Sequence, residues 1–163
     1  MSHYDARTYS PRASIGYLMR RGAALMRDQL ELALAQHGFT FAQWVTLVLV
    51  RDDATRTPGD LCRELHHDTG AFTRILDQLE ERGFLKRQRS DADRRVVQLR
   101  LTAAGRKATD TMLPVVVERL NGALEGFTAA EVAMLTGLLN RLIVRLEQQA
   151  AGSQNASPQG PVR

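Results

Sequence analysis

The sequence contains one cysteine, Cys62, and no hydrophobic run long enough to cross a membrane. A single cysteine among 163 residues cannot form an internal disulfide. A membrane-spanning helix needs about 18 or more consecutive apolar residues, and residues 1–12 lack the apolar core of a signal peptide. The four histidines are scattered, so they predict neither a structural metal site nor a cofactor. These absences predict a cytoplasmic protein of one domain that needs no disulfide or metal to fold.

Sequence signatures of enzymes are missing as well. There is no glycine-rich phosphate loop, no Ser-His-Asp signature and no His-Glu-x-x-His metal motif. The adjacent His66 and His67 would point in different directions, which is a poor geometry for binding one metal ion. We therefore predict that the chain is not an enzyme.

Positive charge is concentrated in two segments of the chain. Residues 84–107 hold eight basic and two acidic side chains, a net charge of +6, and residues 1–30 carry +3, whereas the whole chain carries only +4. A focused basic patch on a nearly neutral protein favours a polyanionic partner, most often nucleic acid. All but two of the 22 basic residues are arginine, so a compositional origin, with a solvated basic face, stays an alternative.

The first third of the chain predicts two helices. Residues 13–36 carry two adjacent apolar rows, a wider apolar face than a surface helix needs, and Gly38 is placed to end the helix. Thr40 and Gln43 then have the spacing of a capping box. The helix that follows, to about Val50, is apolar nearly all round and is predicted to be the buried centre of the domain.

A helix-turn-helix is predicted next. Thr57 followed by Pro58 is a helix start signal, and the short helix runs to about Leu65. Asp68 caps a second, amphipathic helix that ends before Gly83. A short helix, a tight turn and a second helix form this motif.

Residues 84–89 and 96–101 alternate apolar and polar side chains, which is typical of strands. The polar loop between them carries two arginines, so the pair forms a hairpin, or wing, directly after the helix-turn-helix. A helix over 102–124 follows. Thr128 and Glu131 then form a capping box, after which apolar residues step by three and four as in a coiled coil.

Three segments carry a resemblance to a known family: DTGAFTRILDQLEERG (68–83), DADRR (91–95) and LTAAG (101–105). With the order of helices, over about residues 13–149, they resemble the MarR family of bacterial transcription regulators. The resemblance implies a mainly α (α+β) fold, a winged helix-turn-helix with N- and C-terminal dimerisation helices. The expected parts are a flexible arm (1–12), a dimerisation helix (13–36), the DNA-binding domain (37–101), two dimerisation helices (102–149) and a disordered tail (150–163).

A homodimer is implied by the family, and the apolar helices agree with it, because the faces over residues 15–34 and 132–146 exceed what one small domain can cover. The alternatives are a larger monomer core and a protein-interaction module. Two helix-turn-helix motifs related by a twofold axis predict double-stranded DNA with an inverted-repeat operator, its half-sites about 10 bp apart.

The N-terminal half of the second motif helix is expected to enter the major groove and the wing tip the minor groove. The candidate DNA contacts are Thr69, Gly70, Ala71, Thr73, Arg74, Arg94, Arg95 and, from the preceding helix, Arg63. Family pattern implies that Asp93 orients Arg95. For Arg94 and for Arg95, an ordinary surface ion pair is the alternative. A non-specific architectural DNA-binding protein is the alternative for the whole chain.

The family resemblance also implies a repressor that a small aromatic carboxylate or phenolic effector releases from DNA. Arginine with aromatic and histidine groups suits such a ligand. The candidate ligand residues are Tyr17, Arg20, Arg21, Trp44, His66 and His67. Core packing of Trp44 and solvation of the arginines are the alternatives. A redox-responsive repressor acting through Cys62 is a further alternative, although the predicted inner-face position of Cys62 favours inert packing.

Overall fold

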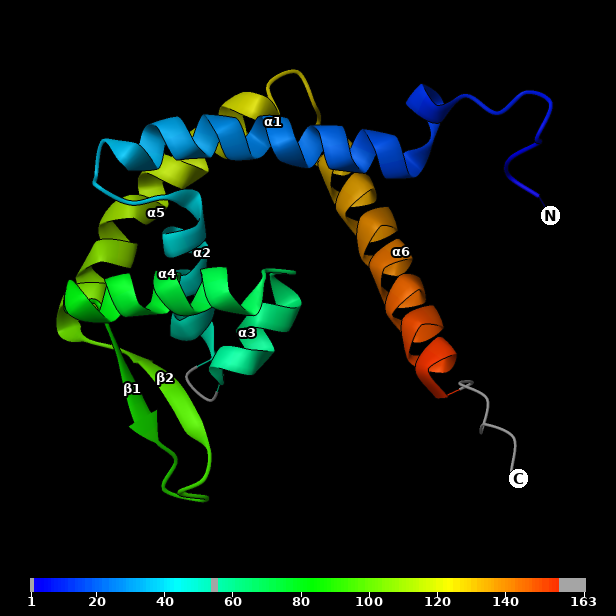
Figure 1. Cartoon of the computed structure of the whole chain (residues 1–163). Helices are drawn as coiled ribbons and strands as arrows, with labels where there is room; N and C mark the ends of the chain where they lie inside the picture. Colours follow the sequence, from blue (N-terminus) through cyan, green and yellow to red (C-terminus); the bar gives the residue numbers. More distant parts are fainter. Residues whose placement is uncertain (1, 54–55, 156–163) are drawn as a thin grey trace, which may run out of the picture. The chain divides into compact units, whose positions relative to one another are not determined.

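The computed structural model describes residues 2–53 and 56–155, which form helices and one β-hairpin (Figure 1). In chain order the elements are η1 (Pro11–Ala13), α1 (Ile15–Ala35), α2 (Phe41–Asp52), α3 (Pro58–Glu64), α4 (Thr69–Glu81), β1 (Leu85–Arg89), β2 (Val97–Leu101), α5 (Ala103–Ala123) and α6 (Ala129–Asn155). The mainly α fold class with one antiparallel hairpin is confirmed. None of the helices described is long and apolar enough to cross a membrane.

Local side-chain chemistry explains where the helices begin. Thr40 accepts a hydrogen bond from the backbone N–H of Gln43, whose side chain accepts one from the backbone N–H of Thr40, both at 3.2 Å. This reciprocal capping box satisfies two backbone donors that a helix start leaves free. The same arrangement occurs at Thr57 with Asp60 and at Thr128 with Glu131. These predicted helix starts are confirmed.

The chain divides into a larger unit that ends at Ala123 and a smaller one that starts at Leu124. In the larger unit α2 contacts α1, α4, α5 and β2. Trp44, Leu47 and Val50 of α2 are buried, as the prediction of a central helix required. The surrounding elements therefore pack against α2, and this packing holds the larger unit together.

The hairpin pairs in the register Leu85↔Leu101, so that Arg87 lies opposite Leu99. Alternation places Leu85, Leu99 and Leu101 on the buried face. β2 also makes a hydrogen bond outside the hairpin, because the Leu99 N–H donates to the carbonyl of Arg56 at 3.0 Å. The wing thus grows from a base that is fixed to the core and to the segment before α3.

Much of α1 leaves its apolar face uncovered in the single chain. Only its last turns, at Leu30, Ala33 and Leu34, are buried. Ile15, Leu18, Leu25 and Leu32 are 51%, 54%, 56% and 70% exposed. The wide apolar face expected from the sequence is present, and the core of the larger unit covers one end of it.

The smaller unit consists of α6, which the structure continues to Asn155, past residue 149, where the sequence analysis ended it. Residues 150–155, expected to be disordered, are therefore helical, and the rest of that expected tail lies outside the described residues. Six large apolar side chains on α6 are at least 43% exposed: Met134, Leu135, Leu138, Ile143, Val144 and Leu146. At the other end of the chain, the expected N-terminal arm makes a local contact, since the hydroxyl of Tyr4 accepts from the Ile15 N–H at 3.0 Å.

Gly105 of α5 yields a stability prediction. A Cβ at this position would lie 2.0 Å from the carbonyl oxygen of Phe84, which already accepts from the Thr102 N–H at 3.1 Å. Because backbone must move to admit a methyl group, Gly105→Ala should lower the free energy of unfolding by about 1–3 kcal/mol. Denaturant unfolding at one fixed protein concentration measures this change.

Gly122, on the same helix, is the matched control. A Cβ there meets no atom within 4 Å, and alanine is the better helix former by up to about 1 kcal/mol. Gly122→Ala should therefore be neutral or stabilising. Equal unfolding free energies for the two variants would contradict the described contact between α5 and Phe84.

Candidate nucleic-acid interface

The turn between α3 and α4 fixes the start of α4. His66 has a φ of 51°, the one positive φ outside glycine among the described residues, and the His67 N–H donates to the Cys62 carbonyl at 3.1 Å. Asp68 then accepts from the N–H groups of Gly70 and Ala71, both at 3.0 Å. A tight turn and an aspartate cap thus aim the first turn of α4 away from the core.

The five candidate DNA-contacting residues on α4 are all exposed, whereas Phe72 between them is buried. The Thr73 hydroxyl donates to the carbonyl of Thr69 at 2.8 Å, which leaves its oxygen free to accept. At Gly70 a Cβ would make a tight contact, 3.2 Å from Oδ1 of the capping Asp68. The Arg74 side chain makes no hydrogen bond or ion pair within the described residues, so its guanidinium is available to a ligand.

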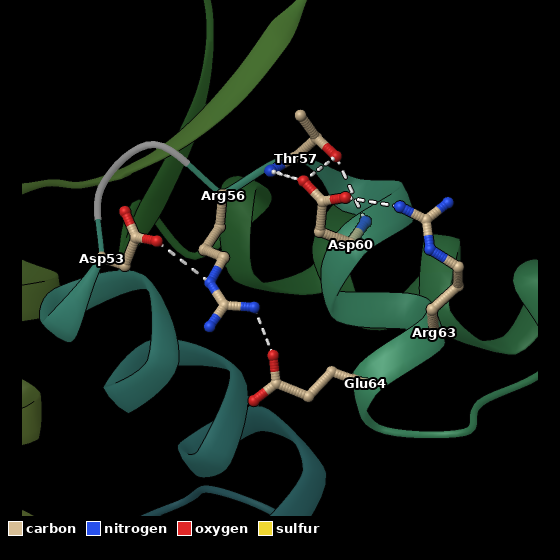
Figure 2. A network of polar contacts seen from close by, with 6 residues as sticks. All are labelled: Asp53, Arg56, Thr57, Asp60, Arg63 and Glu64. Carbon is tan, nitrogen blue, oxygen red and sulfur yellow. Dashed lines mark hydrogen bonds and ion pairs between the residues drawn. The ribbon is translucent and has the colours of Figure 1, made fainter. Parts of the chain in front are cut away.

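Arg63 on α3 is held by an acidic neighbour. Its Nη2 lies 2.5 Å from Asp60 Oδ1, and its side chain is 77% exposed (Figure 2). Asp60 also accepts from the N–H of Thr57 at 3.1 Å and from its hydroxyl at 2.7 Å. These hydrogen bonds, with a smaller contribution from Arg63, hold the pKa of Asp60 below its usual range. A phosphate that binds Arg63 would compete with this carboxylate.

A second ion-pair group lies beside the first and connects the segment before α3 to the last residue of that helix (Figure 2). Arg56 bonds Asp53 at 3.2 Å and also pairs with Glu64. The hydrogen bond and charge of Glu64 raise the pKa of Arg56 above its ordinary value. Since the Arg56 carbonyl also binds β2, this residue links the segment before α3 to the hairpin.

The wing tip presents two free arginines. Arg94 and Arg95 are exposed, and their guanidinium groups have no partner among the residues described. Asp93 accepts from the backbone N–H of Arg95 at 2.9 Å, so it shapes the turn through the backbone and not by pairing with the guanidinium. The Ser90 N–H closes the loop onto the Val96 carbonyl at 2.8 Å.

Sequence reasoning missed the contacts between α4 and β1. Arg87 pairs with Asp77, 2.7 Å from Nη2 to Oδ1, and with Glu80. Burial alone would lower the pKa of Arg87. The hydrogen bonds and charges of both carboxylates outweigh burial, so the pKa lies above its ordinary value. The sequence showed an acidic second half of α4, but its partner follows from the tertiary packing of β1.

A cavity of about 950 Å³ lies in the larger unit, bounded by α1, α2, the α3–α4 turn, α4 and Leu120. Its lining is mostly apolar, and its polar side chains include Arg27, Glu31, His66 and His67. Glu31 is already engaged, because it accepts from the Phe41 N–H at 2.7 Å. Arg27 and the two histidines are therefore the cationic or titratable groups offered to a ligand.

Four of the six candidate ligand residues do not line this cavity. Trp44 is buried in the core, and its Nε1 has no hydrogen-bond partner among the described residues. Arg20 and Arg21 instead contact Tyr17, at 5.7 Å from guanidinium to ring and 3.4 Å from Nη1 to hydroxyl. The first turns of α1 extend past the core, and Arg27, two helical turns after Arg20, is the arginine at the cavity.

The predicted inner-face position of Cys62 implied a fully buried thiol, but the residue is only half-buried. Its thiol donates to the His67 carbonyl at 3.2 Å. With Arg63, Thr69 and Thr73 it lines a cavity of about 230 Å³ between α3 and α4. No group of three or more side chains suited to holding a metal ion occurs in residues 2–53 and 56–155.

Comparison with known proteins gives consistent matches. A sequence model described as MarR family matches residues 37–96. The multiple antibiotic resistance protein MarR of Escherichia coli is 35% identical over 105 residues, which is 64% of this chain and 73% of that protein. The transcriptional repressor MprA of E. coli is 27% identical over 132 residues, or 80% of this chain and 74% of its own.

Solved structures agree with the sequence matches. A mutant of E. coli MarR complexed with operator DNA superposes with a TM-score of 0.69 at 30% identity, covering 78% of this chain and 92% of that one. Bordetella bronchiseptica BpsR, whose DNA binding is regulated by 6-hydroxynicotinic acid, gives 0.71 at 25% identity, covering 82% and 96%. A Mycobacterium tuberculosis MarR family protein in complex with salicylic acid gives 0.69 at 26% identity, covering 82% and 99%.

The lowered pKa of Asp60 gives a pH prediction. A carboxylate whose folded-state pKa is depressed stabilises the fold above its unfolded value, about 3.9, and this stabilisation is lost as the pH falls through the folded value. Asp60→Asn should therefore lower the melting temperature at pH 7, and the difference from wild type should shrink below about pH 4. Thermal unfolding from pH 7 down to pH 3 measures it.

The matched control is Arg63→Gln, which removes the ion pair but leaves the capping box intact. Because an exposed ion pair contributes little, this variant should unfold close to wild type at every pH. A melting-temperature difference for Asp60→Asn that stays constant over the whole pH range would show that the charge of Asp60 is unimportant.

Proposed function

The chain belongs to the MarR family of transcription regulators, and we propose that it acts as a homodimeric repressor released from an inverted-repeat operator by a small aromatic acid or phenol. The observation that carries the proposal is the free, outward N-terminal half of α4 beside a wing with two unpaired arginines. Helix and hairpin supply the two elements that read the major and minor grooves. The relative MprA is a transcriptional repressor by name, which supports repression as the proposed mode of regulation.

A second copy of the chain is the proposed partner of the exposed apolar faces. Eleven leucine, isoleucine, valine and methionine side chains on α1 and α6 are 40–70% exposed in the single chain, and isolated domains rarely leave apolar patches of this extent in water. A twofold interface presents the same surface from both subunits. Dimerisation would place two α4 helices on one face of DNA, with half-sites about 10 bp apart.

The proposed DNA contacts divide by role. Thr69, Thr73 and Arg74 would face bases and phosphates in the major groove, and Gly70 and Ala71 would allow close approach of the helix. Arg94 and Arg95 would enter the minor groove, where guanidinium groups are favoured by narrow A·T tracts. Arg63 would add a phosphate contact, in competition with Asp60.

The proposed effector site is the cavity at α1, α2 and α4. An aromatic ring would lie on its apolar lining, and a carboxylate would pair with Arg27 or accept a hydrogen bond from His66 or His67. The ligands of the two structural relatives, 6-hydroxynicotinic acid and salicylic acid, are small aromatic acids of this kind. Since the cavity contacts both α1 and α4, a ligand there could bind two arrangements of these helices unequally, which release of DNA requires.

Selection from a random duplex library tests the DNA-binding proposal. We expect enrichment of an inverted repeat, bound at least about 10³-fold more tightly than scrambled DNA. Arg95→Ala should then weaken binding to the selected duplex and flatten its dependence on log salt by about two, one contact from each subunit. Fluorescence anisotropy at several salt concentrations provides both values.

Arg119→Ala is the control, because Arg119 is an exposed arginine near the end of α5, whereas β2 of the wing joins the start of that helix. It should leave affinity and salt slope nearly unchanged. No enriched sequence would favour the architectural alternative, and an Arg95→Ala variant identical to wild type would remove the wing from the mechanism.

Thermal melts with a panel of small aromatic acids test the effector proposal. A ligand specific for the native state raises stability by RT ln(1 + [L]/Kd), about 2.7 kcal/mol at a hundredfold excess over Kd. The best acid should also weaken binding to the selected duplex. Arg27→Gln should abolish most of the melting-temperature shift, whereas Arg20→Gln, on the same helix but outside the cavity, should retain it.

Two outcomes would contradict this account. A shift retained by Arg27→Gln would place the acid elsewhere. No shift with any acid, together with loss of DNA binding on peroxide treatment in wild type but not in Cys62→Ser, would favour the redox alternative.

A further inference from the structure

Arg87 makes three polar contacts to α4 from the strand β1. Its Nη2 donates to Asp77 Oδ1 at 2.7 Å, its Nη1 pairs with Glu80 Oε2, and its backbone N–H donates to Glu80 Oε1 at 2.9 Å. The Arg87 side chain is 30% exposed, against 57% for Asp77 and 37% for Glu80. Within the described residues, these are the side-chain hydrogen bonds and ion pairs between α4 and the hairpin.

These contacts lie between the two elements of the proposed DNA interface. Asp77 and Glu80 are three residues apart, so they share one face of α4, and Asp77 lies one turn after Thr73 and Arg74. Arg87 is paired with Leu99 on the buried side of the hairpin that carries Arg94 and Arg95. The contacts therefore join the helix proposed for the major groove to the hairpin proposed for the minor groove.

The guanidinium of Arg87 is suited to fixing the orientation of the hairpin on α4, and not only to attracting the two carboxylates. A guanidinium is a planar fork with donors in fixed directions, and two carboxylates engaged by two of its nitrogens define its plane. A lysine would keep the positive charge but could not hold this geometry. Partly exposed ion pairs add little to overall stability, so their main effect is to restrict how the hairpin lies against α4.

We propose that Arg87 is a positioning residue that locks α4 and the wing into one relative orientation, so that both grooves of the operator are contacted in register. This inference rests on the proposed DNA-binding function. Without the lock, each element could still meet phosphate, but simultaneous base contacts in two grooves would require ordering the wing at an entropic cost. Arg87 would thus determine specificity for the operator without contacting DNA.

Three variants separate geometry from charge. Arg87→Lys keeps the charge and removes the fork, whereas Arg89→Gln removes one charge from an exposed arginine two residues along the same strand. An Asp77→Asn, Glu80→Gln double variant removes the lock from the helix side and guards against a folding defect specific to Arg87. Affinity is measured for the duplex selected with wild type and for a scrambled duplex, and hydrogen exchange of residues 85–101 is measured without DNA.

For Arg87→Lys and for the double variant we expect the ratio of the two affinities to fall by about tenfold, comparable to the loss of one base contact, and hydrogen exchange in the wing to rise. Arg89→Gln should weaken both duplexes similarly, with the ratio and the exchange unchanged. A wild-type ratio and wild-type exchange in both lock variants would overturn the inference. A wild-type protein with no duplex preference would refute the proposed function, and hydrogen exchange would still decide whether Arg87 orders the wing.

Discussion

The burial of one side of α4 is the constraint on which the interface depends. Phe72, Leu76 and Leu79 are at most 2% exposed and pack into the core built on α2. Because a helix presents its side chains at fixed angular intervals, burial of this face leaves Thr69, Thr73 and Arg74 on the outside. The Asp68 cap then fixes which end of the helix projects. The core therefore selects the residues available to DNA before any charge is considered.

The second constraint is an excess of apolar surface. The core of the larger unit covers only the end of α1, and α6 has no fully buried residue among those described. A second copy would cover these faces and would add a second α4 and a second wing to the proposed DNA-binding surface. Burial of the apolar helices would therefore also set the twofold symmetry of the operator. The cavity at Arg27 uses the covered end of α1 and the back of α4, so the helix proposed for dimerisation also borders the proposed effector site.

Sequence patterns predicted the features that depend on neighbours in the chain. The capping box at Thr40, the helix start at Thr57, the Asp68 cap and the hairpin all follow from spacings of a few residues, and the structure has them. The ion pairs of Arg87 and the cavity position of Arg27 escaped prediction because they depend on how β1 meets α4 and how α1 crosses α2. Trp44 shows the same limit, since its position on a nearly all-apolar helix favoured the core but still allowed a ligand contact. Asp93 was identified from the family motif, yet its partner is the backbone of Arg95, a detail that the motif does not specify.

The most direct test of the account is the mass of the protein with and without DNA, because the dimer connects the apolar helices to an inverted-repeat operator. Sedimentation equilibrium of the full chain, from nanomolar to micromolar concentrations and with the selected duplex added, measures it. The account predicts a dimer alone and two chains on one duplex. A monomer at every concentration that binds the duplex as a single chain would contradict it.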